Sequence, residues 1–224
     1  MKAIKYILAT VLLGSMFACQ KDSLTTEQII DGLKEALRVG TENSVVSANQ
    51  TDGYFGNLAI KILFPDEAQF VADALSVVGL QSVVDDLVLK INRAAEDAAD
   101  EAKPIFLNAI TNITFADALN ILNGADDAAT QYLKENTYDA LKSSFEPDIS
   151  ASLNSVGASQ AWSTVMTAYN ALPVHDPVNT NLGDYTTGKA LDGLFYLVAQ
   201  EEGKIRNDPA ARITEILQTV FGGN

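Results

Sequence analysis

Apolar side chains recur along the chain at intervals of three and four residues, which is the spacing of a helix with one buried face. The first such stretch is preceded by a capping box in which Thr25 and Gln28 are the paired residues. Comparable stretches continue as far as Phe221, without a repeat of fixed period. The pattern predicts an all-α fold, a single compact multi-helix bundle of about nine or ten helices.

Prolines, glycines and capping residues set the expected helix ends. Pro104 is expected to end a helix over residues 81–103 and to begin another. Asn123 and Gly124 are expected to stop the helix that Thr114 caps. Other expected helices are identified by their inward residues: Phe70, Val71, Ala74, Leu75 and Val78 after Pro65; Ile149, Leu153 and Val156; Trp162, Val165, Met166 and Tyr169; Leu191, Leu194, Phe195 and Val198; and Ile213, Ile216, Leu217, Val220 and Phe221 after a cap at Asp208 and Pro209.

Residues 49–65 interrupt the helical pattern. The stretch NQTDGYFGN is rich in turn formers, and LAIKILFP has the character of an extended segment. The extended part fits a short strand, but the sequence has no obvious second strand to pair with it. We therefore interpret this segment as an ordered loop packed by Tyr54, Phe55, Ile60, Ile62 and Phe64.

The N-terminus has the organisation of a secretory signal peptide. Lys2 and Lys5 precede an apolar run over residues 7–13, which is too short to span a membrane. Small residues follow, and Ala18 stands just before Cys19, the one cysteine of the chain. This order predicts a lipoprotein signal peptide over residues 1–18, an acylated tether over 19–23 and a single helical domain over 24–222. The alternative is an ordinary signal peptide followed by a free thiol.

Charge limits the partners that the domain can bind. The formal net charge is −14, and cleavage after Ala18 would remove Lys2 and Lys5 and leave −16. So acidic a chain is poorly suited to nucleic acid, because phosphate binding needs clustered Lys and Arg. It is also not expected to adsorb to an anionic bilayer by charge, so membrane attachment would come from the lipid at Cys19.

Five stretches of the chain together resemble one protein family. They are GLKEALRVGTEN at 32–43, TDGYFGN at 51–57, INRAAEDAADEAKPIF at 91–106, FADALNILNGADDAATQYL at 115–133 and YTTGKALDGLFYLVAQEEGKIRNDPAAR at 185–212. Their order and spacing are similar to the bacterial lipoproteins grouped as domain of unknown function 4197. The resemblance implies an all-helical envelope lipoprotein and brings no catalytic residues with it.

The sequence offers no recognisable catalytic chemistry. His175 is the only histidine, so a histidine-based metal site is nearly excluded, and no GxSxG motif accompanies it. Phosphate-binding loops and dinucleotide fingerprints are also missing from the sequence. We therefore expect no catalytic residue, no metal site and no cofactor, and we interpret His175 as a solvated loop residue.

Three groups of polar residues are the candidates for a ligand site or for structural ties. The group at residues 123–132 lies at a helix junction. There we expect Asp126 or Asp127 to cap free backbone N–H groups rather than leave them for a ligand. Arg93 is expected to be half-buried against a carboxylate, and the two C-terminal arginines are expected to tie helix ends together. The groups are Asn92, Arg93 and Glu96; Asn123, Asp126, Asp127, Thr130 and Tyr132; and Arg206 and Arg212.

These observations lead to one expected function and one alternative. The first is a lipid-anchored, non-catalytic binding or scaffold domain that contacts an envelope protein or a small ligand. We expect it at the outer membrane, on the periplasmic face or the cell surface, since Gln20 rather than Asp follows Cys19. The alternative is a carboxylate-dependent envelope hydrolase or hard-metal protein centred on Glu96, Asp126 and Asp127.

Overall fold

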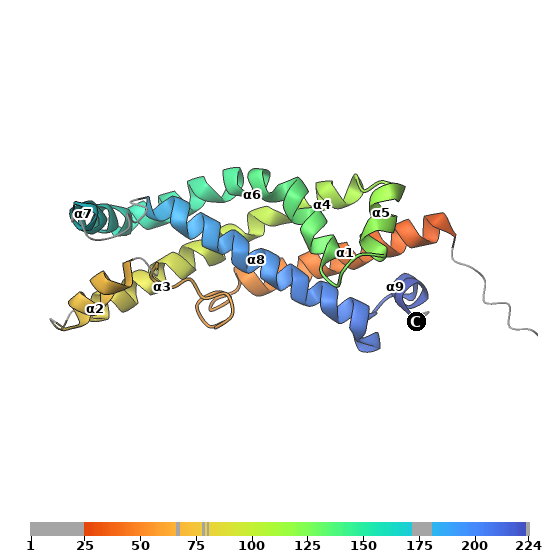
Figure 1. Cartoon of the computed structure of the whole chain (residues 1–224), viewed down its shortest axis with the longest axis horizontal. Coiled ribbons are helices and arrows are strands. Elements are labelled where there is room, and N and C mark those ends of the chain that lie inside the picture. The colour runs from red at the N-terminus through yellow and green to blue at the C-terminus, as the bar shows by residue number, and fades with distance from the viewer. Residues whose placement is uncertain (1–24, 66–67, 78, 80, 172–180, 223–224) are drawn as a thin grey trace, which may run out of the picture.

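The computed structural model describes residues 25–65, 68–77, 79, 81–171 and 181–222. Within these ranges all regular secondary structure is helical, so the predicted all-α class is confirmed (Figure 1). The capping boxes at Thr25 and Thr114 are both present. The elements are α1 (Thr26–Asn49), α2 (Gln69–Val77), α3 (Gln81–Ala98), η2 (Ala99–Glu101), α4 (Ala102–Thr111), α5 (Phe115–Leu122), α6 (Ala128–Ser155), α7 (Ala158–Asn170), α8 (Leu182–Asn207), η3 (Pro209–Ala211) and α9 (Glu215–Phe221).

Helices α3 and α4 form one rod. The 3-10 turn η2 joins them without a loop, and Pro104 is the third residue of α4. Pro104 has no N–H for the carbonyl of Asp100, and the backbone tightens into the 3-10 turn just before it. The expected separation at Pro104 is therefore wrong. With the rod counted as one helix, the described part of the chain has eight helices rather than nine or ten.

Helix α6 includes Ile149 and Leu153, which were expected to lie in a separate helix. Pro147 lies inside α6, on the solvent-exposed side. Pro147 has no N–H to donate to the carbonyl of Ser143. Ser143 is exposed, so water can bind this carbonyl instead. A continuous buried stripe passes the proline and keeps the helix together. Its members are Leu141, Phe145, Ile149 and Leu153.

The C-terminal part ends in shorter pieces than expected. Asn181 caps α8, which starts nine residues before Leu191. The cap at Asp208 is confirmed, but it begins only the short η3. Thr214 then caps α9 separately, and Ile213 between them is 70% exposed rather than buried.

The predicted inner face of α2 is correct for Val71, which packs against the core, and wrong for Phe70 and Ala74. Val78 and the side chain of Leu75 lie outside the described part of the chain. Phe70 is 60% exposed and Ala74 is also exposed, whereas the small residues Ala68 and Ala72 are buried. Alanine at these two positions lets the α2 backbone approach the core closely. Among the described residues no single helix is long and apolar enough to cross a membrane, although the bent pair Gln81–Thr111 and Phe115–Leu122 meets the criteria together.

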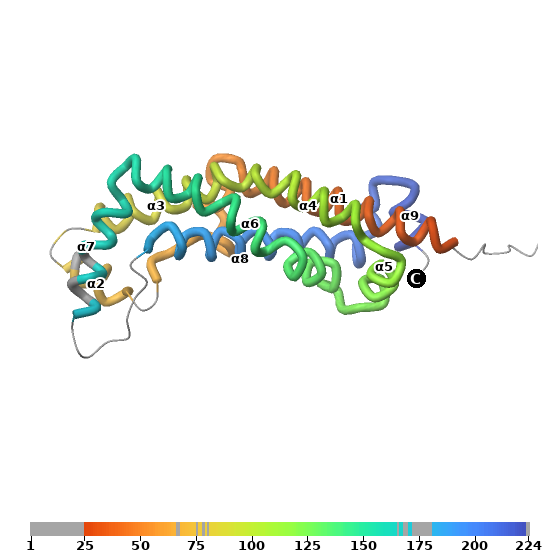
Figure 2. The backbone as a smooth tube through the Cα atoms, turned by 90° about the horizontal axis from the view of Figure 1, so that it is seen from above, coloured from red at the N-terminus to blue at the C-terminus, as the bar shows by residue number. Residues whose placement is uncertain are grey.

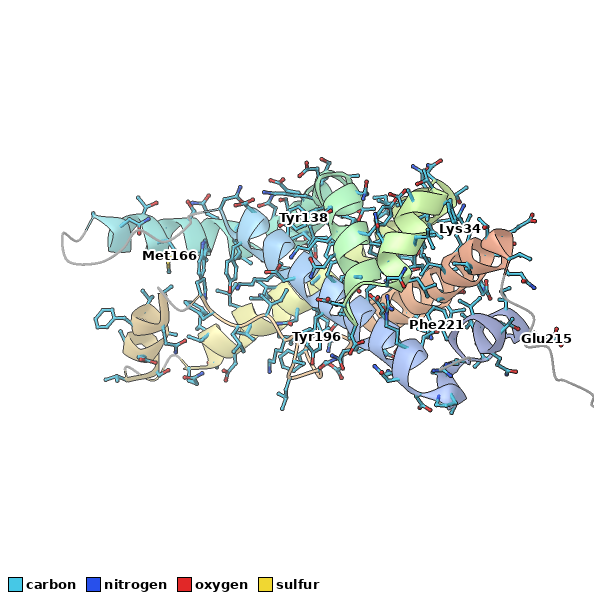
Figure 3. All side chains as sticks on the ribbon, turned by 45° about the vertical axis from the view of Figure 1, so that its right-hand side comes forward. Lys34, Tyr138, Met166, Tyr196, Glu215 and Phe221 are labelled. Carbon is cyan, nitrogen blue, oxygen red and sulfur yellow. The ribbon has the colours of Figure 1, made fainter. Side chains whose placement is uncertain are left out.

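The bundle is elongated, with α1 and the α3–α4 rod along one side and α8 along the other (Figure 2). Small alanine side chains on the rod leave room for neighbouring helices to pack closely. Tyr138 of α6 stacks on Phe195 of α8 with ring centroids 6.5 Å apart (Figure 3). The buried alanines of the rod are Ala94, Ala95, Ala98, Ala99 and Ala102.

Gly193 of α8 is the point where the loop over residues 50–65 docks. A methyl group on Gly193 would come within 2.8 Å of Cε1 of Tyr54 and 3.0 Å of Cβ of Ile60. The Tyr54 ring is fully buried, and its hydroxyl donates to the carbonyl of Ala190 at 2.7 Å. The ring therefore cannot move aside without breaking this bond.

Gly193→Ala is expected to lower the free energy of unfolding by about 1–3 kcal/mol through this overlap. Gly188→Ala is the matched control in the same helix, because its added methyl group meets nothing within 4 Å. The control is expected to raise stability by about 0.5–1 kcal/mol. Urea unfolding measures both, and equal effects of the two substitutions would contradict the docking geometry.

Candidate functional site

The start of α6 is held by a carboxylate from a distant helix. Glu202 of α8 is 8% exposed, and its Oε1 accepts from the backbone N–H of Ala129 at 3.0 Å. Its Oε2 accepts from the backbone N–H and from the hydroxyl of Thr130, both at 2.8 Å. Glu202 thus satisfies two of the four N–H groups that a helix start leaves unpaired, and its charge suits the positive end of the helix dipole.

Arg206 completes this cluster and extends it to a third helix. Its Nε and Nη2 donate to Oε1 of Glu202 at 3.0 and 2.8 Å. Nη2 also donates to the carbonyl of Ile121 at 2.9 Å, at the end of α5. Arg212 acts similarly at the end of α8, donating to the carbonyls of Ile205 and Arg206. Both arginines therefore tie helix ends together.

The aspartates expected to cap α6 do not do so. Asp127 occupies the N-cap position, but its side chain makes no capping hydrogen bond, and Asp126 is exposed. The expectation is wrong because Glu202, which is distant in sequence, takes the N–H groups instead. Asn123 ends α5 as predicted. Tyr132 is partly buried, and burial together with the Asp117 carboxylate raises its pKa.

A second buried carboxylate holds the loop that precedes α2. Glu96 of α3 is 3% exposed, and its Oε1 accepts from the backbone N–H groups of Tyr54 and Phe55 at 3.1 and 3.0 Å. Its Oε2 pairs with Nη1 of Arg93 at 2.5 Å. Arg93 is partly exposed and also reaches Asp52, whose φ of 65° is unusual for a non-glycine residue. Arg93 thus has the carboxylate partner that was expected.

Asn92 supplies the hydrogen bonds that a partner strand would give to the extended part of this loop. Its Oδ1 accepts from the N–H of Ile62 at 2.8 Å, and its Nδ2 donates to the carbonyl of the same residue at 2.7 Å. On the other side, the hydroxyl of Tyr185 donates to the carbonyl of Leu63 at 2.9 Å. The segment is consequently an ordered loop, as predicted, between α3 and α8.

A small cavity lies beside Glu202, among α1, α6, α8 and α9. Its volume is about 20 Å³, which is room for about one water molecule. Phe221 of α9, labelled in Figure 3, is one of the residues that line it. The space is too small for an organic ligand. Its lining residues are Leu33, Ala36, Leu37, Gly40, Ala129, Val198, Glu202, Ile205, Arg206 and Phe221.

The geometry leaves little free chemistry in the candidate residues. All four carboxylate oxygens of Glu96 and Glu202 accept hydrogen bonds from within the protein. Glu96 lies against the loop before α2, whereas Asp126 and Asp127 lie at the start of α6, so the structure does not join them in one site. In the described ranges no group of three or more His, Cys, Asp or Glu side chains could hold a metal ion. His175 and Cys19 lie outside those ranges.

Sequence reasoning missed Glu202, although a signal was present. It lies four residues after Val198 and three before Ile205, both buried on the core face of α8. An acidic residue on an apolar stripe needs a partner, and Arg206 follows it at the i+4 spacing. The backbone N–H groups that it also binds belong to α6, and sequence spacing gives no indication of them.

Comparison with known proteins identifies the family of the chain. Residues 23–222 match a family model described as "Protein of unknown function (DUF4197)", in agreement with the resemblance found in the sequence. No curated protein matches the chain. No solved structure matches it either.

Glu202→Gln is expected to lower the free energy of unfolding by about 3 kcal/mol, because Arg206 and the α6 N–H groups lose a buried anionic partner. The control is Glu42→Gln, which removes one partner of an exposed pair with Arg38. The control is expected to cost about 0.5 kcal/mol or less. Chemical denaturation measures both, and a Glu202→Gln effect as small as the control would contradict the structural role.

Tyr54 is expected to make stability depend on alkaline pH. Burial and the Glu96 carboxylate raise the pKa of Tyr54 well above its ordinary value. The folded state therefore keeps a proton that the unfolded chain loses above about pH 10. For this group the stabilisation is complete below that pH, and above it stability falls by up to about 1.4 kcal/mol per pH unit.

Tyr54→Phe should show a slope shallower by that amount between about pH 10 and 11.5, measured by denaturation at each pH. Its stability near neutral pH should be lower by about 1 kcal/mol, because the bond to Ala190 is lost. The control Tyr196→Phe, at an exposed position, should keep the slope of the unsubstituted protein. If the stability of Tyr54→Phe falls with pH as steeply as that of the unsubstituted protein, the pKa of Tyr54 is not raised in the folded state and the prediction is wrong.

Proposed function

Since the chain belongs to the DUF4197 family, we propose that it is a lipid-anchored envelope protein whose helical domain acts by binding, as a non-catalytic scaffold. The observation that carries the non-catalytic part is the use of both buried carboxylates as anchors for backbone. Glu96 and Glu202 each bind two backbone N–H groups and one arginine. Residues engaged in this way hold loops and helix ends and are not available to substrate.

The anchor in this proposal is a lipid on Cys19. The acylated tether over residues 19–23 has five residues, which could span at most about 17 Å. This tether keeps the start of α1 near the bilayer. With a mature net charge of −16, the domain gains nothing from contact with anionic lipid, so the acyl chains must supply the attachment.

Cys19→Ser is expected to leave an unprocessed precursor that gains no acyl chains. Globomycin, which blocks the lipoprotein signal peptidase, should produce the same precursor from the unsubstituted chain. Ser23→Ala, four residues further on, is the matched control and should be processed normally. Gel mobility, fatty-acid labelling and membrane fractionation measure the outcome.

Normal processing, labelling and membrane attachment of Cys19→Ser would contradict the proposal. If Cys19→Ser is not processed, proteolysis of intact cells distinguishes the two locations that the proposal allows. Cleavage of the domain indicates the cell surface, and protection until the outer membrane is opened indicates the periplasmic face.

A further inference from the structure

The corner between α4 and α5 is an exposed surface without charged side chains. Residues 104–116 contain no Asp, Glu, Lys or Arg, although 20% of the whole chain is charged. Leu107 is 54% exposed, and Phe115, the first residue of α5, is 41% exposed. We call residues 107–116 the α4–α5 corner. Its other exposed members are Asn108, Thr111, Asn112, Thr114 and Ala116.

Several polar groups of the corner already have hydrogen-bond partners within the protein. The hydroxyl of Thr111 donates to the carbonyl of Leu107 at 2.8 Å, and the side-chain amide of Asn112 donates to the carbonyl of Asn108 at 2.9 Å. The carbonyl of Thr111 accepts from Nζ of Lys34 in α1 at 2.8 Å. Because groups paired in this way lose little when water is removed, the corner can enter a less polar environment at a low cost in free energy.

The corner lies beside the start of α1, because α1 and the α3–α4 rod run in opposite directions. Lys34, near the start of α1, contacts Thr111 at the end of α4, whereas Asn49 at the end of α1 donates to the carbonyl of Glu96 in α3 at 3.0 Å. Helix α1 begins at Thr26, about 12 Å before Lys34 along the helix axis. Figure 1 shows α5 and the start of α1 at the same end of the molecule.

A short tether would hold this end close to a bilayer. If Cys19 carries the lipid, as the proposed function holds, the tether over residues 19–23 spans at most about 17 Å. A folded domain of about 100 residues has a radius of gyration of about 13 Å, so its width exceeds this gap. The surface that the tether brings to the corner is therefore lipid rather than a folded partner. The placement of the corner rests on the proposed function, but its chemistry does not.

We propose that the α4–α5 corner rests on the lipid surface beside the anchor, with Phe115 and Leu107 in the layer between headgroups and acyl chains. Exposed Phe and Leu side chains suit that layer. Glu27 and Asp31, exposed in the first turns of α1, would be repelled by anionic lipid, so the contact is with zwitterionic headgroups. The acyl chains supply the attachment, and the corner sets the orientation of the bundle, with α2 and α7 at the end away from the bilayer (Figure 1).

The test attaches the mature chain, residues 19–224, to phosphatidylcholine vesicles through a maleimide lipid that reacts with Cys19, the one thiol of the chain. Phe115→Trp and, separately, Leu107→Trp place an indole at the corner. Brominated acyl chains quench indoles that enter the bilayer. Both variants should therefore emit less in brominated than in unbrominated vesicles, and their emission should move to shorter wavelength on attachment. Trp162 is 2% exposed, and its emission is subtracted with that of the parent chain.

Val83→Trp is the matched control. Val83 is 53% exposed, close to the value for Leu107, and lies about 36 Å from Leu107 along the same rod. Its emission should be the same in brominated and unbrominated vesicles, and all three variants should keep the thermal melting of the parent chain. Unquenched emission from both corner variants, or equal quenching of Val83→Trp, would overturn the proposal.

A second copy of the chain is the other occupant that the experiment distinguishes. Without vesicles the chain should sediment as a monomer, and a dimer that Phe115→Ser dissociates would overturn the proposal in favour of that occupant. Quenching confined to vesicles that contain anionic lipid would overturn it as well. Because coupling through the maleimide replaces acylation, a failure of Cys19 processing in cells and a failure of the corner to reach lipid are separate results.

Discussion

The buried carboxylate of Glu202 is the contact on which the arrangement of the long helices depends. It joins α8 to the first N–H groups of α6, and through Arg206 it also reaches the end of α5. Helices α6 and α8 are among the longest in the described chain and pack along each other, so one pair of side chains fixes where they meet. A buried ion pair need not add net stability, but removing one member leaves the other uncompensated in a low-dielectric interior. Loss of Glu202 would therefore leave Arg206 and the first N–H groups of α6 buried without their partner.

Glu96 repeats this solution at a second place. Again a carboxylate binds two consecutive backbone N–H groups and an arginine from its own helix, here to hold the loop that carries Tyr54. With Asn92 and Tyr185 pairing the rest of that loop, its backbone has the partners that a second strand would have supplied. The polar residues with the strongest appearance of a site thus serve the fold. Under the proposed function, binding would fall to the outer surface of the domain.

Local signals were predictable from the sequence, and contacts between distant segments were not. The capping boxes at Thr25 and Thr114 and the helix end at Asn123 involve residues within one turn of each other, so spacing alone identifies them. The helix expected separately around Ile149 is part of α6, because the buried stripe through Phe145 and Ile149 continues past Pro147. In the candidate site, Arg93 and Arg206 were correctly expected to be ties. Asp127 was wrongly expected to cap α6, because its competitor Glu202 is 75 residues away in sequence.

Native-state hydrogen exchange of four backbone amides tests most directly whether the buried carboxylates hold the fold. These are the amides of Tyr54 and Phe55, bound by Glu96, and of Ala129 and Thr130, bound by Glu202. If the carboxylates hold the bundle, these amides exchange only through global unfolding, at the same free energy as the most protected core amides. Exchange of these four amides through local opening, while amides in the middle of α6 and α8 stay protected, would contradict this account.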